Sequence, residues 1–147
     1  MAEREGVVKI LLKHIDLANG KIERDKTLAV IESVPKQFQL VLWAIMQLDV
    51  KRDKRTKRDD WRKDIRDDRI FTGDVYNVYQ DVCGKTRNEV LTQRRVGDIL
   101  AEFDMLGIIN AHVISKGRHG RTREIKLMIT PEIREKAKEI LEKSLDL

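Results

Sequence analysis

Apolar residues recur at helical spacing between residues 92 and 107 of the chain. The positions i, i+3, i+4, i+7 and i+10 are occupied by Val96, Ile99, Leu100, Phe103 and Leu106. At about 100° per residue these side chains form one stripe on a helix. Thr92 stands where an N-cap is expected, and Gly107 stands where a helix commonly stops. The pattern therefore predicts an amphipathic helix that begins after Thr92 and ends at Gly107.

The residues that follow alternate between apolar and polar side chains, which is typical of strands half-buried on a core. The alternating apolar residues are Ile109, Ala111 and Val113 before a turn, and Ile125, Leu127 and Ile129 after it. The turn lies within residues 115–123, where Gly117 and Gly120 allow a positive φ. We expect a β-hairpin with a glycine-flanked tip.

Three further segments show helical spacing. Pro35 opens the first, which has apolar residues on two faces and should therefore be the central core helix. Thr72 is expected to cap the second helix, which ends near Gly84. Its inward-facing residues are expected to be Val75, Val78, Tyr79 and Val82. Thr130 as N-cap and Pro131 as first residue begin the last helix, whose apolar face holds Ile133, Ala137, Ile140 and Leu141.

Residues 1–33 have helical spacing but too few apolar residues for a core of their own. The spacing of Ile15, Ala18, Ile22, Leu28 and Ile31 predicts a helix that runs to about Ser33 despite Gly20. A short apolar stretch, residues 7–12, precedes it. We expect residues 1–33 to be the end of a larger domain and to dock on the second apolar face of the helix that Pro35 opens.

Composition and charge narrow the class of protein. With 147 residues, 41% of them hydrophobic, the chain can bury one modest core. No apolar run approaches the roughly 20 residues of a membrane span, so no membrane association is expected. The single cysteine, Cys83, excludes an internal disulfide and fits a reducing cytoplasm. The three histidines, His14, His112 and His119, are too far apart in the sequence to form a metal site with Cys83.

Charge is concentrated in one segment of the chain. The formal net charge is +5, and sixteen of the twenty residues from 51 to 70 are charged. Only Trp61, Ile65 and Ile70 could anchor this segment to a core. Because runs of mixed sign are usually solvated surface, we expect an exposed loop, mobile or partly helical.

Basic residues mark the predicted helix at 92–106 and the hairpin that follows it. The first turn of the helix contains Gln93, Arg94 and Arg95, where cations oppose the helix dipole. Helix stability does not explain these arginines, whereas a phosphate-lined groove would. The hairpin tip holds four cations and no acid, namely Lys116, Arg118, Arg121 and Arg123. A helix followed by a basic hairpin, or wing, is the layout of a winged helix-turn-helix, so we expect binding to double-stranded DNA.

Four segments in the same order resemble the C-terminal region of archaeal replication initiators related to the eukaryotic origin-recognition and cell-division-control proteins. They are "IERDKTLAVIESVPKQFQLVLWAI", "FTGDVYNVYQDVC", "LTQRRVGDILAEFDMLGIINA" and "SKGRHGRTREI", and together they cover most of residues 15–129. The resemblance implies a mostly α fold with a small β-hairpin wing. It divides the chain into a remnant of the helical lid of an AAA+ domain, residues 1–33, and a winged-helix DNA-binding domain, residues 34–147, with a charged insertion at 51–70. The "AEREG" at 2–6 resembles the end of a lid helix.

The same resemblance implies a set of DNA-contacting residues. Thr92, Gln93, Arg94 and Arg95 correspond to the start of the DNA-facing helix. The wing residues are Lys116, Arg118, His119, Arg121 and Arg123, with His119 standing where the family is expected to have an aromatic such as tyrosine. The implied partner is double-stranded DNA with origin repeats, bound by a monomeric, cytoplasmic and nucleoid-associated fragment.

The resemblance also implies a cofactor that this segment should not hold. ATP and Mg²⁺ belong to the ATPase domain of the family, and the chain contains no G-x-x-x-x-G-K-[ST] loop. No other catalytic constellation is present in the sequence. We therefore expect a binding domain without a cofactor, a metal or a catalytic site.

Two other classes of protein remain open on the sequence alone. A transcription regulator would normally be a dimer, and the predicted helix at 132–147 could serve as its dimerisation element. A protein-interaction module is the second class, with the replicative helicase as the partner that the family suggests. Light scattering would separate the dimeric regulator from a monomeric fragment. Titration with random duplex DNA would separate the interaction module from both.

Overall fold

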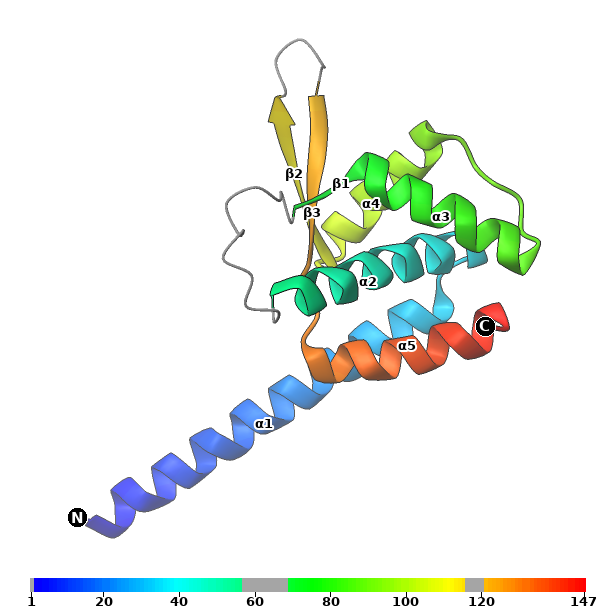
Figure 1. Ribbon diagram of the computed structural model, residues 1–147. Helices are drawn as coiled ribbons and strands as arrows, with labels where there is room; N and C mark the ends of the chain where they lie inside the picture. The colour runs from blue at the N-terminus through cyan, green and yellow to red at the C-terminus, as the bar shows by residue number, and fades with distance from the viewer. Residues whose placement is uncertain (1, 57–68, 116–120) are drawn as a thin grey trace.

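The computed structural model describes residues 2–56, 69–115 and 121–147 and shows five helices and a small antiparallel sheet in them (Figure 1). The helices are α1 (Ala2–Ser33), α2 (Lys36–Thr56), α3 (Thr72–Thr86), α4 (Gln93–Met105) and α5 (Pro131–Leu145). The strands are β1 (Ile70–Phe71), β2 (Ile109–Ser115) and β3 (Arg121–Leu127). This arrangement confirms the predicted winged helix fold, mostly helical with a β wing. No helix in the described ranges combines the length and the low polarity that a bilayer span requires.

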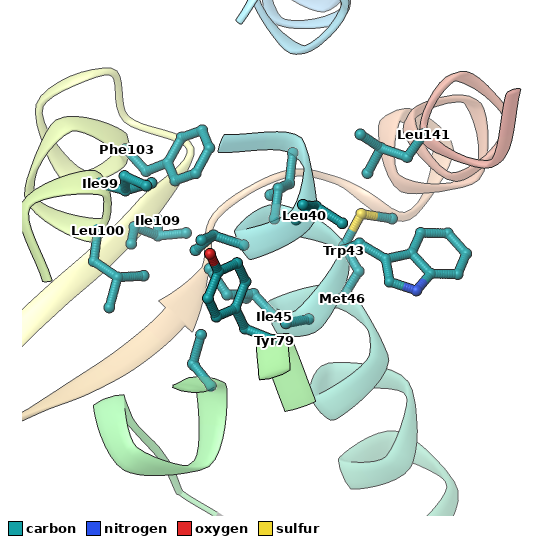
Figure 2. Packing of buried hydrophobic residues seen from close by; sticks show 14 of the residues in the cluster. Leu40, Trp43, Ile45, Met46, Tyr79, Ile99, Leu100, Phe103, Ile109 and Leu141 are labelled. Atoms are coloured by element: carbon teal, nitrogen blue, oxygen red, sulfur yellow. The ribbon is translucent and has the colours of Figure 1, made fainter. Parts of the chain in front are cut away.

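Helix α2 is the centre of the core, as its two apolar faces predict. Every residue from Leu40 to Met46 is buried. Figure 2 shows Ile45 beside Tyr79 of α3, while Trp43 and Met46 point toward Leu141 of α5. The helix therefore separates two layers, with α3, α4 and the sheet on one side and α5 on the other (Figure 1).

Helix α1 docks on this core only through its last turns, so the predicted docking on α2 is wrong for most of its length. Ile31 is fully buried, but Ile15 and Ile22 are 54% and 51% exposed. The second face of α2 is covered instead by α5, through Ala137, Leu141 and Leu145. Around Gly20, α1 passes the start of α5, and the earlier part of α1 projects beyond it (Figure 1). Residues 7–12, expected to precede the helix, belong to it.

Helix α3 differs from the prediction at both ends. Its N-cap is Phe71, whose N–H donates to Asp74 Oδ2 at 3.0 Å, so Thr72 is the first helical residue and not the cap. The Thr72 hydroxyl instead donates to the Arg123 carbonyl of β3. At the other end the helix continues through Gly84 to Thr86 and closes at Arg87, which adopts the left-handed conformation with φ 55°.

The sheet has the order β1-β3-β2, with all pairs antiparallel. β2 and β3 pair from Ile109↔Leu127 to Ser115↔Arg121, which confirms the predicted hairpin. Strand β1 was not predicted, because it has only two residues, Ile70 at the end of the charged segment and Phe71 after it, and two residues are too few to show a period. Ile70 is buried and pairs with Ile125. Of that charged segment, residues 51–56 belong to α2, and residues 57–68 lie outside the described ranges.

The predicted burial holds where the elements meet the core and fails at their ends. Ile109 and Ile125 are buried at the base of the hairpin, whereas Val113 is 56% exposed. The reason is that the ribbon of β2 and β3 extends beyond the helices (Figure 1). In α4, Val96, Ile99, Leu100 and Phe103 are buried, but Leu106 is 52% exposed because it is the C-cap that follows the last helical residue.

Candidate nucleic-acid interface

The first turn of α4 presents its polar side chains to solvent. Thr92 is the N-cap, as predicted, and its Oγ1 accepts a hydrogen bond from Arg95 N–H at 3.3 Å. Gln93, Arg94 and Arg95 are exposed, and the first turn contains no acidic residue. The apolar stripe that begins at Val96 is buried on the opposite side. The local sequence thus directs two arginines away from the protein at a capped helix end.

The segment that leads into α4 is held by neutral hydrogen bonds from α2 and α3. The Tyr79 hydroxyl accepts from Leu91 N–H at 2.9 Å and donates to Gln37 Oε1 at 2.6 Å. Tyr76 donates to the Leu91 carbonyl at 3.0 Å, and Gln37 Nε2 donates to the Glu89 carbonyl at 2.9 Å. The start of α4 is therefore fixed in place before any ligand is present.

Two buried titratable groups lie at the centre of this arrangement. Burial raises the pKa of Tyr79 to about 12, against the opposing effect of its hydrogen bond from Leu91. Burial also raises the pKa of the Cys83 thiol, and its hydrogen bond with Tyr79 acts in the other direction. Tyr79 therefore stays a neutral phenol at physiological pH, able to donate and accept at once. Its sequence position indicated only an inward-facing residue, and nothing local marked it as a polar support.

The wing is attached to both helices by hydrogen bonds near its base. Arg123 is half-buried, and its Nη1 donates to the Gly97 carbonyl of α4 at 3.1 Å. The Thr72 hydroxyl of α3 donates to the Arg123 carbonyl at 3.3 Å. On the neighbouring strand, Ala111 N–H donates to Asp104 Oδ1 at 3.1 Å. These bonds were not predicted, because each joins a strand residue to a helix residue, and two of them join residues 26 and 51 positions apart.

The structure brings some of the predicted contact residues together and leaves others undescribed. The start of α4 and the outer part of the β2–β3 ribbon extend to the same side of the molecule (Figure 1). Arg94 and Arg95 lie at that helix start, and Arg123 of the ribbon is hydrogen-bonded to Gly97, about one turn further along α4. Lys116, Arg118 and His119 lie outside the described residues, and only the backbone of Arg121 is described. Within the described ranges, no three metal-binding side chains gather at one place.

Comparisons with known proteins agree with this architecture. A family model for the CDC6 C-terminal winged helix domain matches residues 29–137. An ORC1-type DNA replication protein of Pyrococcus horikoshii is 45% identical over 131 residues, which are 89% of this chain and 28% of that relative. ORC1-type DNA replication protein 1 of Methanosarcina mazei is 42% identical over 132 residues, which are 90% of this chain and 29% of that relative. The chain spans less than a third of the length of these curated relatives.

Solved structures show the same fold. The ORC1 protein of Aeropyrum pernix, solved in complex with DNA, aligns with a TM-score of 0.67 and 33% identity over 89% of this chain and 30% of its own. Cdc6p of Pyrobaculum aerophilum aligns with a TM-score of 0.55 over 80% of this chain and 26% of its own, and at 16% identity it supports the fold alone. The family model matches most of the chain, and archaeal DNA replication proteins match most of it as well. The chain belongs to the family of CDC6 C-terminal winged helix domains.

Proposed function

We propose that this chain is the sequence-selective, double-stranded DNA-binding domain of a replication initiator and that it binds repeats at a replication origin. The observation that carries the proposal is the start of α4, where exposed Arg94 and Arg95 follow a threonine cap with no acid in the turn. The tyrosine and glutamine bonds to residues 89–91 hold this end rigid. The relative from Aeropyrum pernix was solved with DNA, which supports the same kind of ligand here.

In this proposal the helix reads bases and the wing contacts the backbone. Arg94 lies on the exposed side of α4, opposite the buried stripe, and approaches base edges in the major groove. One bidentate arginine–guanine pair discriminates against a wrong base by about 1–3 kcal/mol. The basic wing residues Lys116, Arg118 and Arg121, together with His119, contact phosphates or a narrow minor groove. Thr92 and Gln93 contact the backbone at the helix start.

Fluorescence anisotropy with an origin-derived duplex and a scrambled duplex of equal length tests the proposal. Arg94→Ala should weaken binding to the origin duplex more than to the scrambled one, whereas Arg121→Ala should weaken both alike. Lys136→Ala removes one exposed cation from α5 and is the charge-matched control, with no expected loss on either duplex. Equal losses on both duplexes for Arg94→Ala would refute base reading by α4 and leave non-specific attachment only.

Salt dependence separates DNA from a protein partner. If Arg94, Arg95, Lys116, Arg118 and Arg121 neutralise about five phosphates, log K should fall against log[salt] with a slope of roughly −4 to −5. Arg121→Ala should reduce this slope by about one unit. Binding that barely responds to salt would count against the proposal and in favour of a protein-interaction module.

We propose that the domain acts as a monomer and hydrolyses nothing by itself. The apolar face of α5, which a dimeric regulator would need, is buried against α2 in the same chain through Ala137, Leu141 and Leu145. The sequence has no phosphate-binding loop, so ATP and Mg²⁺ would be bound elsewhere in an initiator that contains this domain. Light scattering that gives twice the chain mass would overturn the monomer, and measured ATP turnover would overturn the second claim.

A further inference from the structure

Strand β3 leaves the body of the domain at Arg123. Strand β1 pairs with β3 only at Glu124 and Ile125, so from Arg123 outward the described part of β3 pairs with β2 alone. A two-stranded ribbon is marginally stable by itself in water. The direction in which the wing points must therefore be set at the residues where the ribbon meets the helices.

Arg123 makes two bonds at this meeting point, one to each helix that flanks it. Its carbonyl accepts from the hydroxyl of Thr72, the first residue of α3. Its guanidinium donates to the carbonyl of Gly97, one turn after Arg94 in α4. In an α-helix that carbonyl also accepts the N–H of the residue four positions on, so the arginine adds a second, charged donor. The ribbon is thus tied directly to the turn that carries the exposed arginines.

We propose that Arg123 is a positioning residue, which fixes the angle between the wing and α4 in the free protein and does not itself bind DNA. The inference rests on the proposed function, because it concerns how two DNA-contacting elements are held at one spacing. A wing that is already fixed loses less conformational freedom when it meets the duplex, and this raises affinity without adding a contact. Thr72 completes the attachment from the side of α3.

The proposal differs from a phosphate contact in what happens without DNA. A residue that only contacts phosphate leaves the free protein unchanged when it is removed, and costs about one unit of salt slope. A positioning residue changes the stability of the ribbon in the free protein. The uncharged partner Thr72 should then matter as well, although it carries no charge to give to DNA.

Hydrogen exchange of the free protein, read by mass spectrometry or NMR, gives the first test. Arg123→Gln and Thr72→Val should each accelerate exchange of the ribbon amides in residues 111–115 and 121–124, while the amides of residues 41–45 in α2 keep their protection. Arg94→Gln is the matched control, because it removes an exposed arginine from α4 and should leave ribbon exchange unchanged. Loss of one hydrogen bond predicts an acceleration of about two- to tenfold.

DNA binding by the same variants gives the second test. Thr72→Val should weaken binding by about two- to tenfold although it removes no charge. If Arg123→Gln leaves ribbon exchange unchanged and lowers the salt slope by about one unit, Arg123 is a DNA contact and the proposal is overturned. If Arg123→Gln fails to fold, Thr72→Val decides, and unchanged exchange and affinity in that variant also overturn it. Failure of the wild type to bind duplex DNA would refute the proposed function, while the exchange data would still show whether Arg123 holds the ribbon.

Discussion

The starts of α4 and α5 have the same backbone arrangement and opposite charge. Each helix begins after a threonine whose hydroxyl accepts an N–H three residues on, Thr92 from Arg95 at 3.3 Å and Thr130 from Ile133 at 3.5 Å. The first turn of α5 contains Glu132, whereas that of α4 contains no acid and two arginines. Because the dipole favours acids at a helix start, α5 is arranged for its own stability and α4 is not.

The two helix starts are also held in different ways. Near the start of α5, Arg134 forms ion pairs with Asp49, which is buried in α2, and with Asp53. The start of α4 is held by the neutral hydrogen bonds of Tyr79 and Gln37. The cation near the start of α5, Arg134, is therefore paired with carboxylates of the same chain, whereas Arg94 and Arg95 of α4 lie exposed at the surface. The proposed anionic partner, DNA, would account for this difference.

Charge reversal at α4 should have the largest effect on binding. Arg94→Glu combined with Arg95→Glu should weaken DNA binding by more than tenfold, that is by about 1.4 kcal/mol or more, because one base contact alone is worth about 1–3 kcal/mol. Glu132→Gln changes the corresponding turn of α5 and should leave DNA affinity unchanged. Anisotropy titrations at fixed salt measure both variants. Equal affinity of the two variants would remove the functional distinction between the helix starts.

Removal of the Tyr79 hydroxyl should loosen the start of α4. Tyr79→Phe leaves Leu91 N–H without its partner, so the free energy of unfolding should fall by about 1–3 kcal/mol. The wild type should also lose stability as pH rises from 10 to about 12, because the unfolded chain releases the phenol proton near pH 10 and the fold retains it. Urea denaturation across this range should show a larger loss in the wild type than in the variant, because the buried Cys83 thiol, whose pKa is also raised, contributes to both. The same alkaline loss in Tyr79→Phe would assign it to another group.

Substitution of Gly97 in α4 tests whether this glycine lowers the stability of the helix but lets its backbone lie close to DNA. A Cβ at Gly97 would meet nothing within 4 Å, so Gly97→Ala should raise the free energy of unfolding by about 0.5–1 kcal/mol. The added methyl group lies on the face with Arg94, and DNA binding should weaken. Gly84→Ala in α3 is the matched control, since that Cβ is equally free of contacts. It should stabilise by a similar amount without affecting DNA, and unimpaired binding by Gly97→Ala would show that α4 does not approach the duplex closely.

First-turn charges should have the smallest effects, and these effects should have opposite signs. Arg95→Gln should raise the free energy of unfolding, and Glu132→Gln should lower it, each by about 0.3–1 kcal/mol at low salt. Thermal or urea denaturation measures the pair, and both differences should shrink in 1 M salt. Shifts of the same sign would show that the dipole does not explain the contrast between α4 and α5.

Local patterns predicted most of the fold. The period of apolar residues and the threonine caps predicted α4 and α5, because both signals lie within the helix itself. The same reasoning failed at Thr72, whose hydroxyl donates a hydrogen bond to the Arg123 carbonyl and does not cap α3. It also failed at β1, which is a strand only because it pairs with β3. It also failed for α1, since no local signal says that α5 occupies the second face of α2.

The charged residues of the candidate interface could be predicted from the sequence, whereas the hydrogen bonds that hold its elements in place could not. Arg94 and Arg95 stood out because they oppose the dipole of their own helix. The bonds of Tyr79 to Leu91 and of Arg123 to Gly97 depend on side chains meeting across the fold, which no spacing rule reveals. The sequence therefore indicated which groups are proposed to face a partner, and the structure shows which neighbouring side chains hold that region in place.

The lone cysteine gives this domain a built-in chemical reporter. Cys83 is fully buried in α3, and burial raises the pKa of its thiol, so neither the sulfur nor its reactive thiolate is available to an alkylating reagent in the closed fold. Modification then requires the segment around α3 to open, and its rate in excess reagent follows how often that opening occurs. Since the chain has one cysteine, a single mass shift counts opened molecules without any engineered label. Two parallel reactions, one with duplex DNA and one without, would compare how often the free and the bound protein open.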